Sequence, residues 1–297
     1  MPNLRFKQSS LFILLFLLIL SSCSKYQKLL KSDDVLLKKE KAIEYYENDD
    51  YHRAIGLLTD IIPVYRGTAH AEELNYYYAM AHYKQGDYIL AAHYFKSFTQ
   101  GFPRSEHNEE FLFLSAYCQY LLSPRPSLDQ TTTRKAIAEL QSFINRYPNS
   151  PRVEESNKLI DELREKMEVK SYQTAMLFFN IRDYMAAVKS FNNLIRDFPD
   201  TKFREEAMYM IIRSHFLYAE NSIEARQLER FEKVVEAHRR FSNRYPDSEY
   251  HNNTQRLLDT AQREINRLEQ IATARKEAAA AAAANKSEVS EEAAQVN

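Results

Sequence analysis

The chain has 297 residues, of which 44% are hydrophobic and 27% charged, with a formal net charge of −1. Four glycines and nine prolines are too few for the many turns of a β-rich protein, so the composition favours an all-α fold. The nearly balanced charge lacks the basic excess typical of nucleic-acid-binding proteins.

The first 22 residues have the three parts of an export signal. Arg5 and Lys7 supply positive charge, and 11–20 (LFILLFLLIL) is an apolar run too short to persist as a membrane-spanning helix. The following LSSC (20–23) is a bacterial lipobox, in which small residues precede the cysteine. We therefore expect 1–22 to be removed, Cys23 to receive several acyl chains and 23–35 to form a lipidated linker. An ordinary cleaved signal with an incidental cysteine is the alternative.

Three stretches further along the chain share one pattern: 45–61, 82–98 and 178–194. In each, a polar turn ends in Asp-Tyr, and an alanine follows three residues after the tyrosine. The tyrosines are Tyr51, Tyr88 and Tyr184, and the alanines are Ala54, Ala91 and Ala187. This spacing places tyrosine and alanine on one helix face, where the small side chain lets two paired helices cross closely. The aspartates are expected to cap the helices that follow them.

A second phrase recurs after most of these helices: GFPRS (101–105), RYPNS (146–150), DFPDT (197–201) and RYPDS (244–248). Proline ends a helix, and the Ser or Thr two residues later can cap the next one. The two signals together predict five helix-turn-helix units. Units 1–3 occupy 36–150, and units 4 and 5 with a capping helix occupy 151–271. The expected fold is an all-α solenoid with a long helix at about 152–180 and a capping helix at about 249–270.

The last segment, 272–297, has a different composition. It contains an alanine run followed by polar residues and has no aromatic residue. Such a segment cannot bury enough apolar surface to offset its ordering entropy, so we expect a fraying helix followed by a disordered tail.

A candidate binding surface comes from the repeat register. The first helices of such units form a concave face, where we expect Tyr76, Met80, Tyr83 and Lys84 to lie. Tyrosines in a groove can anchor an extended or helical peptide. The alternative is that these are solvated side chains of an amphipathic helix.

Patterns for catalysis, cofactors and metals are missing from the sequence. GxGxxG, GxxxxGK[ST], HExxH and GxSxG do not occur, and no two of the eight histidines stand at i, i+4. With Cys23 lipidated, Cys118 has no disulfide partner and is expected to be a small core residue. We therefore predict no catalytic residue, no metal site and no cofactor.

The helix-turn-helix pattern resembles the tetratricopeptide repeat. A lipobox followed by five such units and one capping helix is similar to the BamD family, whose members belong to the machinery that inserts β-barrel proteins into the bacterial outer membrane. The resemblance implies anchoring at the periplasmic face of the outer membrane. It implies BamA as a partner of about 152–270, and unfolded β-barrel clients as ligands of about 36–122.

Two other functions stay open at this point. An envelope repeat protein that coordinates division with wall synthesis usually has an N-terminal coiled coil, for which 24–40 is too short. A glycan-binding lipoprotein typically stacks sugars on tryptophan, and this chain has none.

Overall fold

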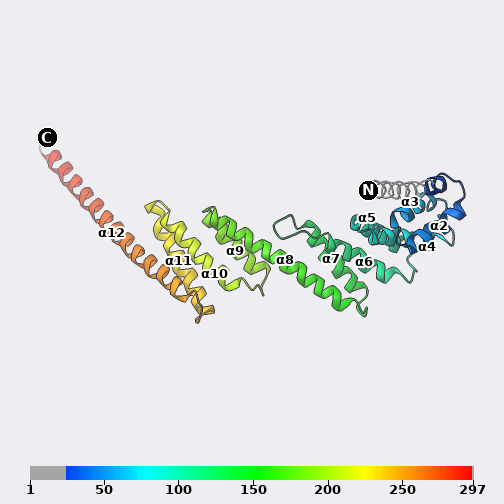
Figure 1. The fold of residues 1–297 in the computed structure, drawn as a ribbon. Helices are drawn as coiled ribbons and strands as arrows, with labels where there is room; N and C mark the ends of the chain where they lie inside the picture. The colour runs from blue at the N-terminus through cyan, green and yellow to red at the C-terminus, as the bar shows by residue number, and fades with distance from the viewer. Residues whose placement is uncertain (1–24, 296–297) are drawn as a thin grey trace, which may run out of the picture. The chain divides into compact units, whose positions relative to one another are not determined.

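The computed structural model describes residues 25–295, with side chains described up to 282, and every regular element in this range is a helix. After a short helical turn at 25–30, the helices follow in chain order (Figure 1). Their bounds are α2 (Val35–Glu47), α3 (Tyr51–Ile61), α4 (Ala71–Lys84), α5 (Tyr88–Gly101), α6 (Asn108–Leu121), α7 (Thr131–Arg146), α8 (Val153–Asn180), α9 (Tyr184–Asp197), α10 (Arg204–Glu220), α11 (Glu224–Arg244) and α12 (His251–Gln295). Five helix pairs, α2/α3 to α10/α11, are followed by α12, so the predicted all-α repeat fold is confirmed.

The chain divides into two compact units, one ending at Arg164 and the other beginning at Glu165. We expected the division at 150/151, before the long helix, whereas the structure places it inside α8. The reason lies in the cores. Leu163 near the middle of α8 belongs to a core cluster of the first unit, and Ala175 near its end belongs to the core of the second.

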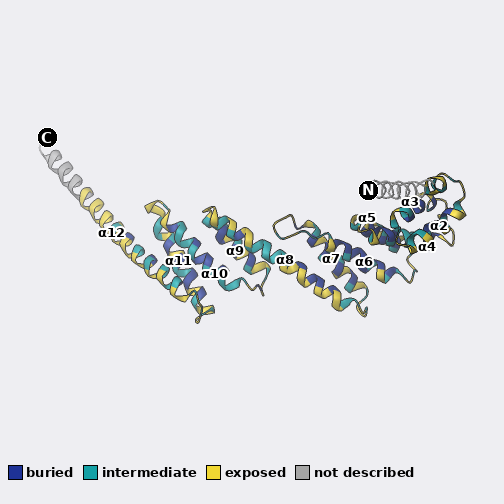
Figure 2. Ribbon diagram, in the orientation of Figure 1, coloured by how far each residue is buried: buried dark blue, intermediate teal, exposed yellow. Residues whose placement is uncertain are grey.

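Large aromatic and aliphatic residues are buried in these cores. Figure 2 marks the buried positions along the helices in dark blue. In the first unit, one cluster around Leu57, Leu58 and Leu74 joins α2, α3 and α4. A second cluster of the same unit extends from α4 to α8. In the second unit, a single cluster runs from α8 to α12. The buried faces recur at helical spacing, as expected for helices that each cover only their neighbours.

The repeated proline phrase ends helices as predicted. In four units the second helix ends directly before the aromatic residue of the phrase. These helices are α5, α7, α9 and α11, and the aromatic residues are Phe102, Tyr147, Phe198 and Tyr245, respectively. Each of these aromatic residues donates its backbone N–H to the carbonyl four residues earlier, and proline follows. The helix cannot continue through the proline, because the ring removes a donor and clashes with the preceding turn.

The turn inside three of the units places one residue in the left-handed region. Gly86 has φ +84°, Asp49 has φ 59° and Arg182 has φ 66°. Each stands directly before the aspartate of the Asp-Tyr pair, so the three turns share one geometry. The sequence indicates a left-handed residue only at Gly86, because glycine adopts positive φ without a steric cost.

The C-terminal segment differs from the expected disordered tail. α12 continues as a helix to Gln295, and 272–282 are exposed along it. Alanine has the highest intrinsic helix propensity, so a run from Ala278 to Ala284 extends an existing helix at little cost.

Candidate interaction surfaces

Cys23, the predicted lipidation site, lies outside the described residues, as does the predicted signal segment 1–22. Within the described residues, none of the helices combines the length and apolar character that crossing a bilayer requires. Membrane attachment through Cys23 therefore stays a prediction.

The three alanines of the repeat pattern lie in the cores. Ala54, Ala91 and Ala187 are each 0% exposed. α3 packs on α2 and α5 packs on α4. Because protein interiors are densely packed, a larger side chain at such a buried position is expected to force displacement. That these positions set how closely the paired helices approach stays a prediction.

The three tyrosines of the pattern are half-buried at the start of the second helices. Each packs its ring against an aromatic residue near the end of the preceding helix. The pairs are Tyr51 with Tyr46 at 5.5 Å between ring centroids, Tyr88 with Tyr83 at 6.0 Å, and Tyr184 with Phe179 at 5.8 Å. Aromatic pairs at this distance stabilise the turn between the two helices.

The aspartates before these tyrosines do not all act as caps. Asp50 accepts the backbone N–H of Arg53 at 3.3 Å, and Asp183 accepts that of Ala186 at 3.1 Å. Asp87 makes no side-chain cap. Its carboxylate instead lies 3.5 Å from Nδ1 of His82 on α4, a buried ring with no hydrogen-bond partner among the described residues. Burial lowers the pKa of His82, and the charge of Asp87 only partly opposes this effect.

The predicted binding residues of α4 are brought together on one helix, but three of them also pack inside the protein. Tyr76, Met80 and Tyr83 are partly buried against the core cluster of α4 to α8. The ring of Tyr76 stacks on Phe111 of α6, with centroids 5.3 Å apart and planes 14° from parallel. Lys84 is exposed. Burial is the main cause that raises the pKa of both tyrosines, so their hydroxyls stay protonated at neutral pH.

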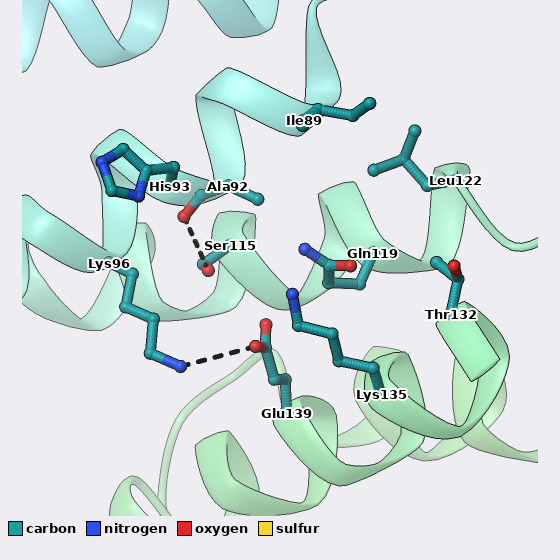
Figure 3. A pocket seen from close by; sticks show the side chains of 10 residues that line it. All are labelled: Ile89, Ala92, His93, Lys96, Ser115, Gln119, Leu122, Thr132, Lys135 and Glu139. Carbon is teal, nitrogen blue, oxygen red and sulfur yellow. Dashed lines mark hydrogen bonds and ion pairs between the residues drawn. The ribbon is translucent and has the colours of Figure 1, made fainter.

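The sequence did not point to a pocket of about 590 Å³ in the first unit, between α5, α6 and α7. Figure 3 shows Ile89 and Leu122 at one side of it, with Lys96 and Glu139 facing each other. The Lys96 ammonium lies 3.6 Å from the Glu139 carboxylate. At its floor, the buried Ser115 hydroxyl donates to the carbonyl of Ala92 at 3.1 Å. The lining residues come from three helices, so only their spacing in the fold reveals the pocket.

No group of three or more histidine, cysteine, aspartate or glutamate side chains gathers into a metal site within the described part of the chain. Cys118 is fully buried, and burial raises the pKa of its thiol to about 12. It therefore remains a protonated core thiol at neutral pH and is a poor nucleophile.

These features define a class of protein: an all-α solenoid of tetratricopeptide-like helix pairs. The sequence matches the YfiO family of outer membrane lipoproteins over residues 38–227, which is more than half of the chain. The chain therefore belongs to this family.

Two named relatives are similar to the chain, one over most of it and one over about a quarter. The outer membrane protein assembly factor BamD of Pasteurella multocida is 21% identical over 216 residues, covering 68% of this chain and 81% of that protein. BamD of Helicobacter pylori is 33% identical over 70 residues, covering 24% of this chain and 32% of that protein. Among solved structures, the tetratricopeptide domain of P58(IPK) aligns with a TM-score of 0.37 and 14% identity, over 81% of this chain and 68% of that domain. The resemblance to the BamD family is confirmed by the family match and these relatives.

Proposed function

We propose that this protein is a lipid-anchored scaffold for assembly of β-barrel proteins, held at the periplasmic face of the outer membrane through Cys23. The observation that carries the proposal is the family match over 38–227, which runs from α2 to the first residues of α11. The relatives are named as outer membrane protein assembly factors.

We further propose two partners, one for each part of the chain. A BamA-like assembly protein binds the C-terminal units, about 152–270, and unfolded β-barrel clients bind the N-terminal units, about 36–122. The division of the chain into two compact units supports separate binding surfaces. In the first of them, Tyr76, Met80, Tyr83 and Lys84 remain the proposed client contacts, because each keeps some exposed surface.

Affinity purification of the full-length protein from detergent-solubilised membranes tests the proposal. We expect a BamA-like β-barrel protein to be identified among the co-purifying chains. Recovery of cell-wall synthesis or division proteins in its place would contradict the assignment and would support the alternative envelope function.

The division of labour is tested with Tyr76→Ala combined with Tyr83→Ala. We expect weaker binding of an unfolded β-barrel peptide and unchanged co-purification of the BamA-like partner. A truncated anchor tyrosine costs about 1–2 kcal/mol of binding. Because Tyr76 also stacks on Phe111, binding must be measured below the unfolding temperature of the variant. Loss of the partner with unchanged peptide affinity would reverse the assignment.

A further inference from the structure

The second unit contains a smaller pocket, of about 320 Å³, among α9, α10 and α11. Its apolar lining comes from Ile195, Met208, Ile211 and Ala237. Three arginines, Arg204, Arg240 and Arg244, also line it, and no lining residue is acidic. We call this feature the arginine pocket.

The three guanidinium groups are only partly used within the protein. Nη2 of Arg204 donates to the carbonyls of Ile195, at 3.2 Å, and Pro199, which holds the group in place. Arg240 reaches Glu236 only at 3.9 Å. That carboxylate is also 3.1 Å from the ammonium of Lys233. Arg244 is exposed and has no ion pair within the described residues.

The neighbouring histidine does not change this charge balance. His215 on α10 is half-buried, and its pKa falls to about 4, first because of burial and then because of the positive charge of Arg240. It is therefore neutral at pH 7 and adds no charge beside the arginines.

We propose that the arginine pocket binds an acidic, apolar peptide segment of a partner protein. A glutamate or aspartate carboxylate of the segment pairs with Arg240 and Arg244, and an adjacent large apolar side chain rests on Met208 and Ile211. A guanidinium matches a carboxylate with two parallel hydrogen bonds, which gives geometric selectivity as well as attraction. Charge complementarity identifies the occupant, because the pocket offers positive charge without any lining carboxylate.

The size of the pocket favours a peptide over a lipid. A volume of about 320 Å³ lies at the small end of ligand pockets, about 300–1,000 Å³, and suits a few side chains rather than several acyl chains. The site also goes beyond the proposed function. Ala237, Arg240 and Arg244 lie after residue 227, where the family match ends, so family membership alone does not imply it.

The test uses the purified protein without its predicted signal segment, 1–22, and with all later residues present. The ligand is a fluorescein-labelled peptide, Gly-Glu-Phe-Glu-Leu-Gly. Fluorescence anisotropy should show saturable binding that weakens with salt, because exposed ion pairs are screened. Arg240→Glu should weaken binding about tenfold or more, since it replaces attraction by repulsion at the carboxylate. The matched control is Arg239→Glu, which makes the same charge change at the neighbouring exposed position of α11 but does not line the pocket. It should leave affinity within about twofold.

Four results would overturn the proposal. The first two are no binding of the peptide by the unmodified protein, and equal affinity for the uncharged peptide Gly-Gln-Phe-Gln-Leu-Gly. The third is an equal loss of peptide affinity in the two arginine variants. The fourth is binding of phosphatidylglycerol vesicles but not of the peptide. The last result would assign the arginines to a membrane surface. The assay contains no membrane extract, so its outcome is independent of whether a BamA-like protein co-purifies.

Discussion

Alanine at the crossing of two helices is the smallest side chain that keeps the helix surface apolar. Ala91 and Ala187 are fully buried and belong to the cores of the first and second unit, respectively. A larger residue at either position must push the paired helices apart or adopt an unfavourable rotamer. Protein interiors are packed densely enough that neither adjustment is free.

Ala91→Leu and Ala187→Leu should each lower the free energy of unfolding by about 1–3 kcal/mol through overpacking. Ala279→Leu serves as the control, because position 279 is exposed on α12. Urea unfolding followed by circular dichroism measures all three. Equal stabilities for the buried and exposed variants would show that the repeat alanines do not set the helix spacing.

His215 should make the stability of the second unit depend on pH. Its pKa is about 4 in the folded protein, below the value of 6.5 of an unperturbed histidine. The unfolded chain therefore takes up this proton first as the pH falls. The contribution of neutral His215 to the free energy of unfolding is fully present above about pH 6.5. It is lost progressively as the pH falls towards 4, and the loss is at most about 3 kcal/mol.

His215→Gln removes the titrating ring and should flatten this part of the profile. The measurement is the Tm of the unmodified protein and of the variant at several values between pH 7 and pH 4. The difference between the two profiles isolates His215, because carboxylates and the other histidines titrate in both. Parallel profiles would contradict the assignment.

At the scale of the element, three turns each need one residue in the left-handed conformation, but only one of them has glycine at that position. Gly86 adopts it without a steric penalty, whereas Arg182 and Asp49 adopt it with a Cβ atom. For an ordinary residue the left-handed conformation costs about 1–2 kcal/mol. Arg182 is therefore strained in a way that Gly86 is not, whereas Asp49 is less affected because aspartate adopts this conformation more readily.

Arg182→Gly should stabilise the protein by up to about 1 kcal/mol, and Gly86→Ala should destabilise it by a similar amount. A Cβ atom at Gly86 would meet no atom within 4 Å, so the loss measured there reports the backbone conformation alone. Chemical denaturation of both variants gives the two signs. Changes of the same sign would mean that side-chain contacts of Arg182 outweigh its backbone strain.

At the scale of the whole molecule, the proposed lipid anchor at Cys23 lies outside the described residues, so it is tested on the protein directly. Cys23→Ala should leave the helix pairs folded but release the protein from membranes or block its processing. Membrane fractionation with a salt wash, together with circular dichroism of the released protein, checks both parts. A mature variant that stays with the membranes would show that lipid is not the anchor.

The sequence by itself determined the elements and their repeat. The Asp-Tyr-x-x-Ala and Tyr/Phe-Pro phrases located five helix pairs, and the expected long helix at about 152–180 agrees with α8, Val153–Asn180. These signals are local: proline ends a helix within one turn, and helical spacing is visible in a single segment. The sequence also predicted the family, through the combination of lipobox and repeat.

The tertiary structure decided what depends on residues far apart in the chain. Asp87 faces His82 rather than capping its helix, and Tyr76 stacks on Phe111, so neither role follows from local spacing. The boundary between the units falls inside α8 because the start and the end of one continuous helix join different cores. The arginine pocket gathers Arg204 from α10 with Arg240 and Arg244 from α11, and only the packing of these helices brings their charges together.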